Sequence, residues 1–473
     1  MSSTTAVSDD ASSATETPAQ QPQAASSRQW VCLAIVAAGM FMANLDTTIV
    51  NVALGNIGAQ FGTGVDSLMW VVNGYTLSFA ALILLGGTLS DRFGARLAFV
   101  IGLGVFTLAS MACALAIDPT SLIVARVIQG AGAALFLPAS LAIVRVIFDD
   151  PAARVRAVSW WATIATVAFA LGPVVGGVLV DAFGWRSAFW FNAPVGVGAM
   201  LLAIAIIPKV SRNAARTLDL AGQALSITML AAFCIGVAEL TDHTLMSPTA
   251  WVPLILSAVA LVAFIAVERR VDNPMVPIHW FQNRLFSSMV VAGMLVFLGF
   301  FGVLFALSIY MQEFLRIDAH TTGIRLLPLA ISLSVGNLLS ARLAFIERGR
   351  LMAGGLALSA VTLPLAVWSM AAGMHPAASM AAFFVFGAGA ALSVAPTIAT
   401  VLEQVPASDA GVASGVLNAA RQSGSLFGVT LASMAIFLAP SLNGALWSVV
   451  VIGSFSLLCA ALLALGAKAR QKA

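Results

Sequence analysis

The chain has 473 residues, of which 60% are hydrophobic and 9% are charged, and its formal net charge is +3. Soluble domains carry about 25% charged residues, so this composition excludes a water-soluble globular protein. It predicts an all-α polytopic membrane protein instead, and the small net charge gives no indication of a nucleic-acid partner.

Residues 1–28 differ from the rest of the chain because they are rich in Ser, Thr, Ala, Gln and Pro and contain no apolar run. Such a segment cannot bury a core, so we expect a disordered tail. It is a poor signal peptide, because three acidic residues oppose its single basic residue, Arg28. We assign no function to it.

Fourteen apolar stretches follow this tail, and each is long enough to cross a bilayer as a helix of about 20 residues. They predict about fourteen transmembrane helices. The stretches are residues 31–53, 68–88, 96–116, 121–145, 157–180, 188–207, 219–239, 250–267, 285–309, 323–342, 350–371, 379–401, 411–437 and 444–466.

The Lys and Arg residues alternate between the loops that join these stretches. Of the 23 in the chain, 18 fall in loops and helix ends on the side that holds the N-terminus. Because cytoplasmic loops are enriched in Lys and Arg, this pattern places both termini in the cytoplasm and the chain in the cytoplasmic (inner) membrane. Arg126 and Arg421 stand apart, because they fall inside predicted spans.

An internal repeat links GAGAALFLP at 130–138 with GAGAALSVAP at 387–396, each in the fourth span of a run of six. It predicts two six-helix bundles arranged as inverted repeats, with a helix pair inserted between them. Two repeats around a central cavity are typical of alternating-access transporters. The predicted parts are the cytoplasmic tail at 1–28, the N-terminal bundle at 29–207, the inserted pair with its linkers at 208–284, the C-terminal bundle at 285–466 and a cytoplasmic tail at 467–473.

The first predicted span holds Asp46, the only carboxylate that we place deep in a span. A charge at the bilayer centre costs about 2.5–3.5 kcal/mol on insertion scales. A carboxyl group buried there can load and unload a proton near neutral pH. The alternative is a hydrogen bond to Thr47 or Asn51 that only packs helices together.

Arg126, in the fourth predicted span, is the second buried charge, and its side chain can pair with a carboxylate or with main-chain carbonyls. Arg421, near the C-terminal end of the chain, either binds an anionic or polar substrate group or holds its bundle together. The candidate lining of the substrate cavity comprises Asn44, Asn73, Tyr75, Gln129, Arg421 and Gln422.

The fifth predicted span contains AFALGPVVGG at 168–177. Pro173 breaks the helical hydrogen-bond ladder, and Gly172, Gly176 and Gly177 remove side chains from the helix surface. In lipid this combination lets a neighbouring helix approach closely and lets the helix bend. We therefore expect a helix that rocks at a bundle interface, with static packing as the alternative.

No feature of the chain indicates an enzyme. It contains no phosphate-binding GxxxxGK[ST] motif, so ATP is not the expected energy source. The four cysteines lie in apolar stretches without metal-ligand spacing and are interpreted as small core residues. The four histidines lie in loops or at helix edges and predict no metal site; they are His243, His279, His320 and His375.

Several segments, in the expected order, resemble motifs of the major facilitator superfamily, in its fourteen-helix drug–proton antiporter branch. The resemblance covers essentially everything after Arg28. Two departures are Gly55, where the family usually has proline, and 340–351, which lacks the aspartate of the equivalent first-half loop. The segments are LDTTIVNVAL (45–54), GGTLSDRFGARL (86–97), ARVIQGAGAA (125–134), ALGPVVGG (170–177), WRSAFWFNAPVG (185–196) and GVASGVLNAARQSGSLFG (411–428).

The resemblance implies roles for individual residues. It assigns proton coupling to Asp46 and Arg126, and an antiporter function to the glycines and proline of the fifth helix. It also implies a gating loop in which charges contact a helix end of the opposite bundle only when the cytoplasmic side is closed; the alternative is a solvated turn. The gating residues are Gly87, Asp91, Arg92, Gly94 and Arg96.

The function implied by the resemblance is export of small amphipathic organic compounds, drugs or a metabolite, in exchange for protons. A proton gradient supplies the energy, and no cofactor is expected. The expected partners are the small-molecule substrate, protons and the lipid bilayer, while accessory efflux subunits stay open. The alternatives are a proton-coupled uptake symporter and a membrane sensor or scaffold with the same fold.

Overall fold

The computed structural model of the protein describes residues 26–148, 150–208, 219–242, 248–271, 274–343, 345–406, 409–439 and 441–471. The predicted N-terminal tail lies outside the described residues up to position 25. The first helix, α1 (Ser27–Phe61), has Ser26 as its N-cap, so the predicted boundary at residue 28 falls inside this helix. At the other end, α16 (Leu442–Gln471) continues through most of the predicted tail at 467–473.

The first half of the described chain is a bundle of long helices, because apolar stretches in lipid must satisfy their backbone polar groups internally. Tight turns join the first helices. Gly62 ends α1 with a φ of 62°, and Gly94 joins α2 to α3 with a φ of 100°, which glycine adopts without steric cost. The N-terminal bundle consists of α1, α2 (Val65–Phe93), α3 (Ala95–Ala114), α4 (Pro119–Ile147), α5 (Pro151–Phe183), α6 (Ser187–Trp190) and α7 (Asn192–Ile206).

A helix pair and a second bundle follow. In the pair, α8 (Leu220–Asp242) packs against α9 (Pro248–Glu268), and the short helix η1 (Ile278–Gln282) leads to the second bundle. The C-terminal bundle consists of α10 (Arg284–Ile309), η2 (Tyr310–Phe314), α11 (Ala319–Arg342), α12 (Arg348–Ala371), α13 (Pro376–Ala391), α14 (Val394–Glu403), α15 (Ala410–Leu438) and α16.

Within the described ranges, twelve helices are long and apolar enough to cross a membrane, and α5 becomes a thirteenth if its two bent parts form one span. This count treats α6 with α7, α10 with η2, and α13 with α14 as single spans. Helix α15, with 29 residues, coincides with the remaining predicted stretch at 411–437. The protein is therefore an all-helical, multi-pass membrane protein.

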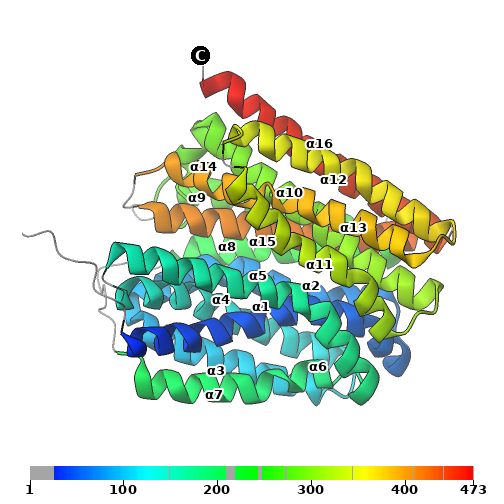
Figure 1. Cartoon of the computed structure of the whole chain (residues 1–473), viewed down its shortest axis with the longest axis horizontal. Coiled ribbons are helices and arrows are strands. Elements are labelled where there is room, and N and C mark those ends of the chain that lie inside the picture. Colours follow the sequence, from blue (N-terminus) through cyan, green and yellow to red (C-terminus); the bar gives the residue numbers. More distant parts are fainter. Residues whose placement is uncertain are drawn as a thin grey trace, which may run out of the picture.

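The two bundles lie next to each other, and Figure 1 shows α3 and α7 at the outer edge of one and α12 and α16 at the outer edge of the other. They meet along two helix pairs, α5 with α11 and α2 with α15. Helix α8 packs against both α2 and α15. The inserted helix pair therefore lies along one of the two seams between the bundles.

The glycines of the internal repeat pack in the same way in both bundles. In α4, a Cβ atom on Gly130 would collide with the backbone of α2, and one on Gly132 would collide with the backbone of α3. In α13, Gly387 approaches α11 and Gly389 approaches α12 just as closely. Small residues let membrane helices come this near. The repeat therefore marks equivalent helices of the two bundles.

The two bundles run in the same direction, which corrects the prediction of inverted repeats. The backbone N–H of Gly55, near the end of α1, donates to Oε1 of Gln312, just beyond the end of α10. The first helices of the two bundles therefore end on the same side of the molecule. The physical reason is the number of crossings, because six helices plus an inserted pair return the chain to the side on which it started.

Candidate transport site

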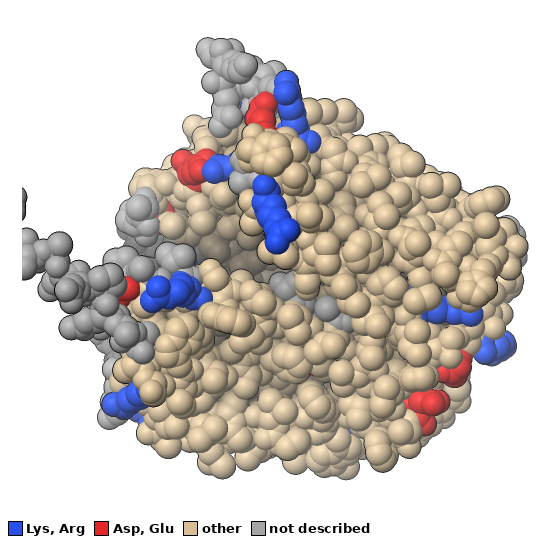
Figure 2. All heavy atoms as spheres, viewed as in Figure 1, with Lys and Arg blue, Asp and Glu red and all other residues tan. Residues whose placement is uncertain are grey.

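A cavity of about 1140 Å³ lies between the two bundles and is lined by residues of both. Its lining reaches the C-terminal ends of α2 and α4 at Asp91 and Arg145, and the start of α15 at Asp409. Figure 2 shows a hollow in this region, with Lys and Arg side chains near its rim. The cavity is therefore open at the end of the molecule where these helix ends lie.

At the opposite end the two bundles are in contact. The hydrogen bond from Gly55 to Gln312, 3.1 Å long, joins α1 to the C-terminal bundle. Helix α5 also meets α11 there, because the Pro173 carbonyl faces Gly323 and Gly177 faces the backbone of Ala319. The described residues thus form a conformation with access from one end only.

Four of the six residues predicted to line the substrate cavity do so, namely Asn44, Tyr75, Arg421 and Gln422. The prediction is wrong for Asn73, whose Nδ2 donates to Oγ1 of Thr430 at 2.6 Å across the seam between α2 and α15. It is also wrong for Gln129, which is fully buried in the N-terminal bundle. The cavity wall also contains polar residues that the sequence did not indicate, such as Thr47, Asn337 and Asn418.

Aromatic side chains form a larger part of the wall than expected. Phe297, Phe300 and Phe301 on α10 line the cavity together with Phe169 on α5. The ring centroids of Phe169 and Phe301 are 5.7 Å apart, so the aromatic wall continues from one bundle to the other. The spacing of three and four residues between the α10 phenylalanines could have identified this face of the helix.

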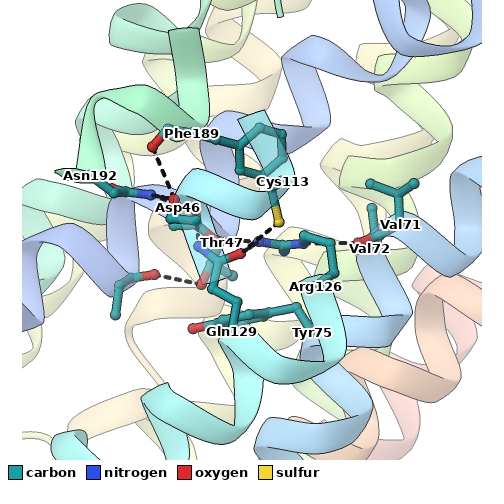
Figure 3. A network of polar contacts seen from close by, with 12 residues as sticks. Asp46, Thr47, Val71, Val72, Tyr75, Cys113, Arg126, Gln129, Phe189 and Asn192 are labelled. Atoms are coloured by element: carbon teal, nitrogen blue, oxygen red, sulfur yellow. Dashed lines mark hydrogen bonds and ion pairs between the residues drawn. The ribbon is translucent and has the colours of Figure 1, made fainter. Parts of the chain in front are cut away.

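A buried charge cluster lies in the N-terminal bundle (Figure 3). Asp46 on α1 and Arg126 on α4 form an ion pair, with Nη1 of Arg126 2.5 Å from Oδ2 of Asp46. The other carboxylate oxygen accepts hydrogen bonds of 2.9 Å from the side-chain amides of Gln129 and Asn192. Asp46 is 0% exposed and Arg126 is 1% exposed, so this pair is shielded from solvent.

The guanidinium of Arg126 is held on several sides. Its Nε donates to the Val71 carbonyl at 3.0 Å, and Nη1 also donates to Oε1 of Gln129 at 2.6 Å. Its carbon Cζ lies 4.5 Å from the centroid of the Tyr75 ring. Both partners that the sequence left open for Arg126, a carboxylate and a main-chain carbonyl, are therefore present.

The buried charge cluster does not lie directly in the cavity wall. Asp46 does not line the cavity, whereas its neighbour Thr47 and Tyr75 do. The ring of Tyr75 contacts Arg126 and also lines the cavity, so it connects the ion pair with the cavity wall. The alternative hydrogen bonds of Asp46 are not formed, because Thr47 donates to the Ala43 carbonyl and Asn51 donates to the Thr47 carbonyl.

Asn192 was not among the predicted site residues, although it belongs to the segment WRSAFWFNAPVG. Its Nδ2 contacts both Asp46 and Oγ of Ser110, which in turn donates to the Phe189 carbonyl. A buried amide in an apolar stretch needs hydrogen-bond partners. That requirement was the signal that could have connected Asn192 with the other buried polar residues.

The GP segment of α5 forms contacts with both bundles. Pro173 has no N–H to donate to the Phe169 carbonyl, and the hydroxyl of Thr48 on α1 donates to that carbonyl instead, at 3.1 Å. The helix bends by 42° at this break. Gly172 and Gly176 lie against α1, within the N-terminal bundle, whereas Gly177 lies against α11 of the other bundle.

The predicted gating loop is shorter than expected. Gly87 lies inside α2, and only Gly94 has the positive φ that the turn requires. Arg96 donates to the Ile204 carbonyl at the end of α7, in its own bundle, and Arg92 lies over the ring of Phe93. These contacts differ from the predicted ones with the opposite bundle, and in this conformation Asp91 lines the open cavity.

The family of the chain follows from its sequence together with this fold. The sequence profile described as Major Facilitator Superfamily matches residues 36–429, which include most of both bundles and the inserted pair. The chain belongs to the major facilitator superfamily. The superfamily match and the two bundles around a central cavity indicate a transporter.

Several similar proteins carry names that refer to drug resistance or efflux. The chain is 35% identical over 409 residues to the methylenomycin A resistance protein of Bacillus subtilis (strain 168), covering 86% of this chain and 87% of that one. It is 36% identical over 411 residues to the protein of the same name from Streptomyces coelicolor, covering 84% of each. It is also 33% identical over 404 residues to the drug efflux pump JefA of Mycobacterium tuberculosis, covering 85% of this chain and 79% of that one.

Solved transporter structures share the fold of this superfamily member. A crystal structure of the peptide transporter POT superposes with a TM-score of 0.70 at 15% identity, covering 93% of this chain and 94% of that one. The xylose transporter XylE from E. coli, in a partially occluded inward-open conformation, gives a TM-score of 0.62 at 15% identity, covering 91% and 98%. At this identity the likeness concerns the arrangement of the helices alone.

Proposed function

We propose that the protein is a secondary active exporter of small amphipathic organic compounds, which it exchanges for protons by alternating access. The observation that carries this proposal is the cavity between two bundles that are separated at one end and in contact at the other. A wall of aromatic rings interrupted by a few polar groups suits a compound with an apolar body and a polar group. The relatives' names, which refer to drug efflux and resistance, favour export.

The inserted pair α8–α9 supports membership of the fourteen-helix branch. If the bent helix α5 is counted as one span, the thirteen apolar helices of the described chain and α15 add up to the fourteen predicted spans. The excess of Lys and Arg on one side supports an orientation in which the open end of the cavity, with Asp91 and Arg145, faces the cytoplasm. In this orientation the conformation is ready to receive a substrate from the cytoplasm or from the inner leaflet.

Reporter fusions test this topology. We expect fusions at positions 119, 245 and 375 to report the outside and fusions at 150, 213 and 275 to report the cytoplasm, because spans alternate between these positions. The decisive position is 245, between α8 and α9. A protein with twelve spans and a cytoplasmic position 245 would contradict the proposed arrangement.

Asp46 is the residue that we propose to carry the coupling proton. Protonation of its carboxyl group would remove the charge that pairs with Arg126, and would thereby change the contacts among α1, α4 and the Asn192 amide. Tyr75 contacts Arg126 and also lines the cavity. A rearrangement of the ion pair would therefore change the cavity wall through the position of this ring.

The driving force is tested in inverted membrane vesicles by collapsing the pH gradient and the membrane potential separately. We expect substrate accumulation to stop when the pH gradient and the membrane potential are both collapsed, and collapse of each alone shows which of them contributes. With one proton per cycle, a monovalent cationic substrate gives an electroneutral exchange, whereas a neutral or anionic substrate adds a contribution of about 2.3 kcal/mol per charge per 100 mV. Substrate uptake into whole cells that requires inward proton flow would favour the symporter instead.

A further inference from the structure

Arg421 on α15 places a positive charge in the wall of the cavity. Its side chain lines the cavity, although the residue is only 7% exposed. Nη2 makes one long hydrogen bond of 3.4 Å to the Val394 carbonyl, and Nε has no partner among the described residues. Its Cζ lies 5.4 Å from the centroid of the Phe297 ring. The guanidinium thus contacts the Val394 carbonyl and the Phe297 ring, and its Nε–H donates no hydrogen bond among the described residues.

No carboxylate of the described chain forms an ion pair with Arg421. Asp409, which also lines the cavity, is twelve residues before Arg421 on the same helix, so the two are about 18 Å apart along the helix axis. Asp91 is at the end of α2 and Asp219 at the start of α8, and both belong to the open end. The acidic residues of the lining therefore lie near the mouth, away from Arg421.

The other buried charges nearby cancel each other. Asp46 and Arg126 form an ion pair, and neither residue lines the cavity. Among the described residues, Arg421 is therefore a charge that lines the cavity away from its mouth without an ion-pair partner, and it is positive. Burial of an unpaired charge costs free energy. An anion that pairs with Arg421 would therefore be bound favourably.

The residues around Arg421 provide an apolar surface next to its positive charge. Phe297, over which the guanidinium lies, belongs to the aromatic wall with Phe300 and Phe301. Gln422, the next residue on α15, also lines the cavity. A planar apolar ring system fits against the phenylalanines, while an acidic group on that ring system can accept from the guanidinium of Arg421.

On the basis of the proposed export function, we propose that the preferred substrates are amphipathic monoanions, in which an aromatic or other planar apolar body carries one carboxylate or sulfonate that binds Arg421. A cation would meet the guanidinium without a nearby carboxylate to offset the repulsion. Neutral compounds of the same shape would bind through the aromatic wall alone.

A matched pair of fluorescent probes tests this inference on the purified full-length protein in lipid nanodiscs. The anion is 1-anilinonaphthalene-8-sulfonate, and the neutral probe is N-phenyl-1-naphthylamine, which has the same ring system without the sulfonate. We expect Arg421→Gln to weaken protein-dependent binding of the sulfonate about tenfold or more, because it removes a hydrogen bond to a charged group. Binding of the neutral probe should change by less than about twofold.

Two further variants separate the explanations. Arg342→Gln removes a positive charge from the exposed end of α11, outside the cavity lining, and should leave binding of both probes nearly unchanged. Arg421→Lys retains the charge and should recover part of the sulfonate affinity. Equal losses for both probes in Arg421→Gln, or equal binding of the sulfonate by Arg421→Gln and the wild type, would overturn the inference.

The binding measurement needs no proton gradient, so its outcome is independent of the export mechanism. If Arg421 selects the sulfonate but vesicles show no proton-driven transport, the proposed export function fails and the anion site stands. If vesicles export both probes equally well and Arg421→Gln has no effect on either, the export function stands and the anion site fails.

Discussion

Asp46→Asn is expected to abolish transport that is driven by a pH gradient while leaving passive exchange of substrate across the membrane. Asparagine has the size of aspartate but cannot release a proton. If the carboxyl of Asp46 is the group that binds the coupling proton, the variant can still alternate between its two access states. The pH gradient, however, no longer drives accumulation of the substrate. The measurement compares gradient-driven accumulation in inverted vesicles with exchange of labelled substrate at equal pH on both sides.

The ion pair with Arg126 affects how the Asp46→Asn variant is interpreted. Asp46 is paired with Arg126, and removal of one member of a buried pair costs about 3–5 kcal/mol because the other charge stays buried. The double variant Asp46→Asn with Arg126→Gln removes both charges and avoids this cost. It should be more stable than Asp46→Asn alone and equally uncoupled.

Stability and coupling are therefore read separately in the two variants. If the pair were only a structural element, the double variant would recover gradient-driven transport together with stability. That result, or coupled transport at the wild-type rate by Asp46→Asn, would reject the proton-carrying role of Asp46.

Gly177→Leu is expected to hold the bundles apart at the end that is in contact in this structure. A Cβ atom on Gly177 would lie 2.9 Å from the carbonyl oxygen of Ala319 and 2.9 Å from Cα of His320, and both atoms belong to the backbone of α11. A backbone cannot move aside as a flexible side chain can. Overpacking costs about 1–3 kcal/mol, which shifts a two-state equilibrium by roughly 5- to 150-fold.

Labelling of a cysteine in the cavity measures this shift. Asn44→Cys places a thiol in the cavity lining, and an impermeant maleimide is added to intact cells or to inverted vesicles. In the wild-type background we expect labelling mainly from the cytoplasmic side, and in Gly177→Leu mainly from the outside. Transport should fall in proportion, because the inward-facing state becomes rare.

A matched control is Gly198→Leu on α7, because a Cβ atom at Gly198 would have no heavy atom within 4 Å. This variant should label and transport like the wild type. Gly176, by contrast, approaches Ile49 of α1 in its own bundle, so a larger side chain there tests the packing of that bundle. Unchanged accessibility of Asn44→Cys in Gly177→Leu would show that the contact between α5 and α11 does not control the switch.

Some features of this protein could be predicted from local sequence because they depend on local physics. Apolar length alone predicts the helices, since a stretch in lipid must satisfy its own backbone. The repeat at 130–138 and 387–396 correctly indicated equivalent helices, because glycines at those points permit close approach in both bundles. Pro173 predicted a bend, since a proline removes its hydrogen bond wherever the helix lies.

Other features depended on contacts between residues far apart in the chain. Asp46 pairs with Arg126, 80 residues away, and with Asn192, 146 residues away. Asn73 and Tyr75 are two residues apart on α2, yet one faces α15 and the other faces the cavity. Residues at that spacing point to nearly opposite sides of a helix, and in an apolar helix no polar face shows which side meets the cavity.

The sequence by itself therefore determined that the chain crosses a membrane many times, where its helices lie and that it contains two related halves. Only the tertiary structure decided that the charge of Asp46 is balanced by Arg126, and that Arg421 lies in the cavity wall without an ion-pair partner among the described residues. The reason is that helix formation in lipid is a property of each segment. The balance of charges depends on which side chains the packing of the helices brings together.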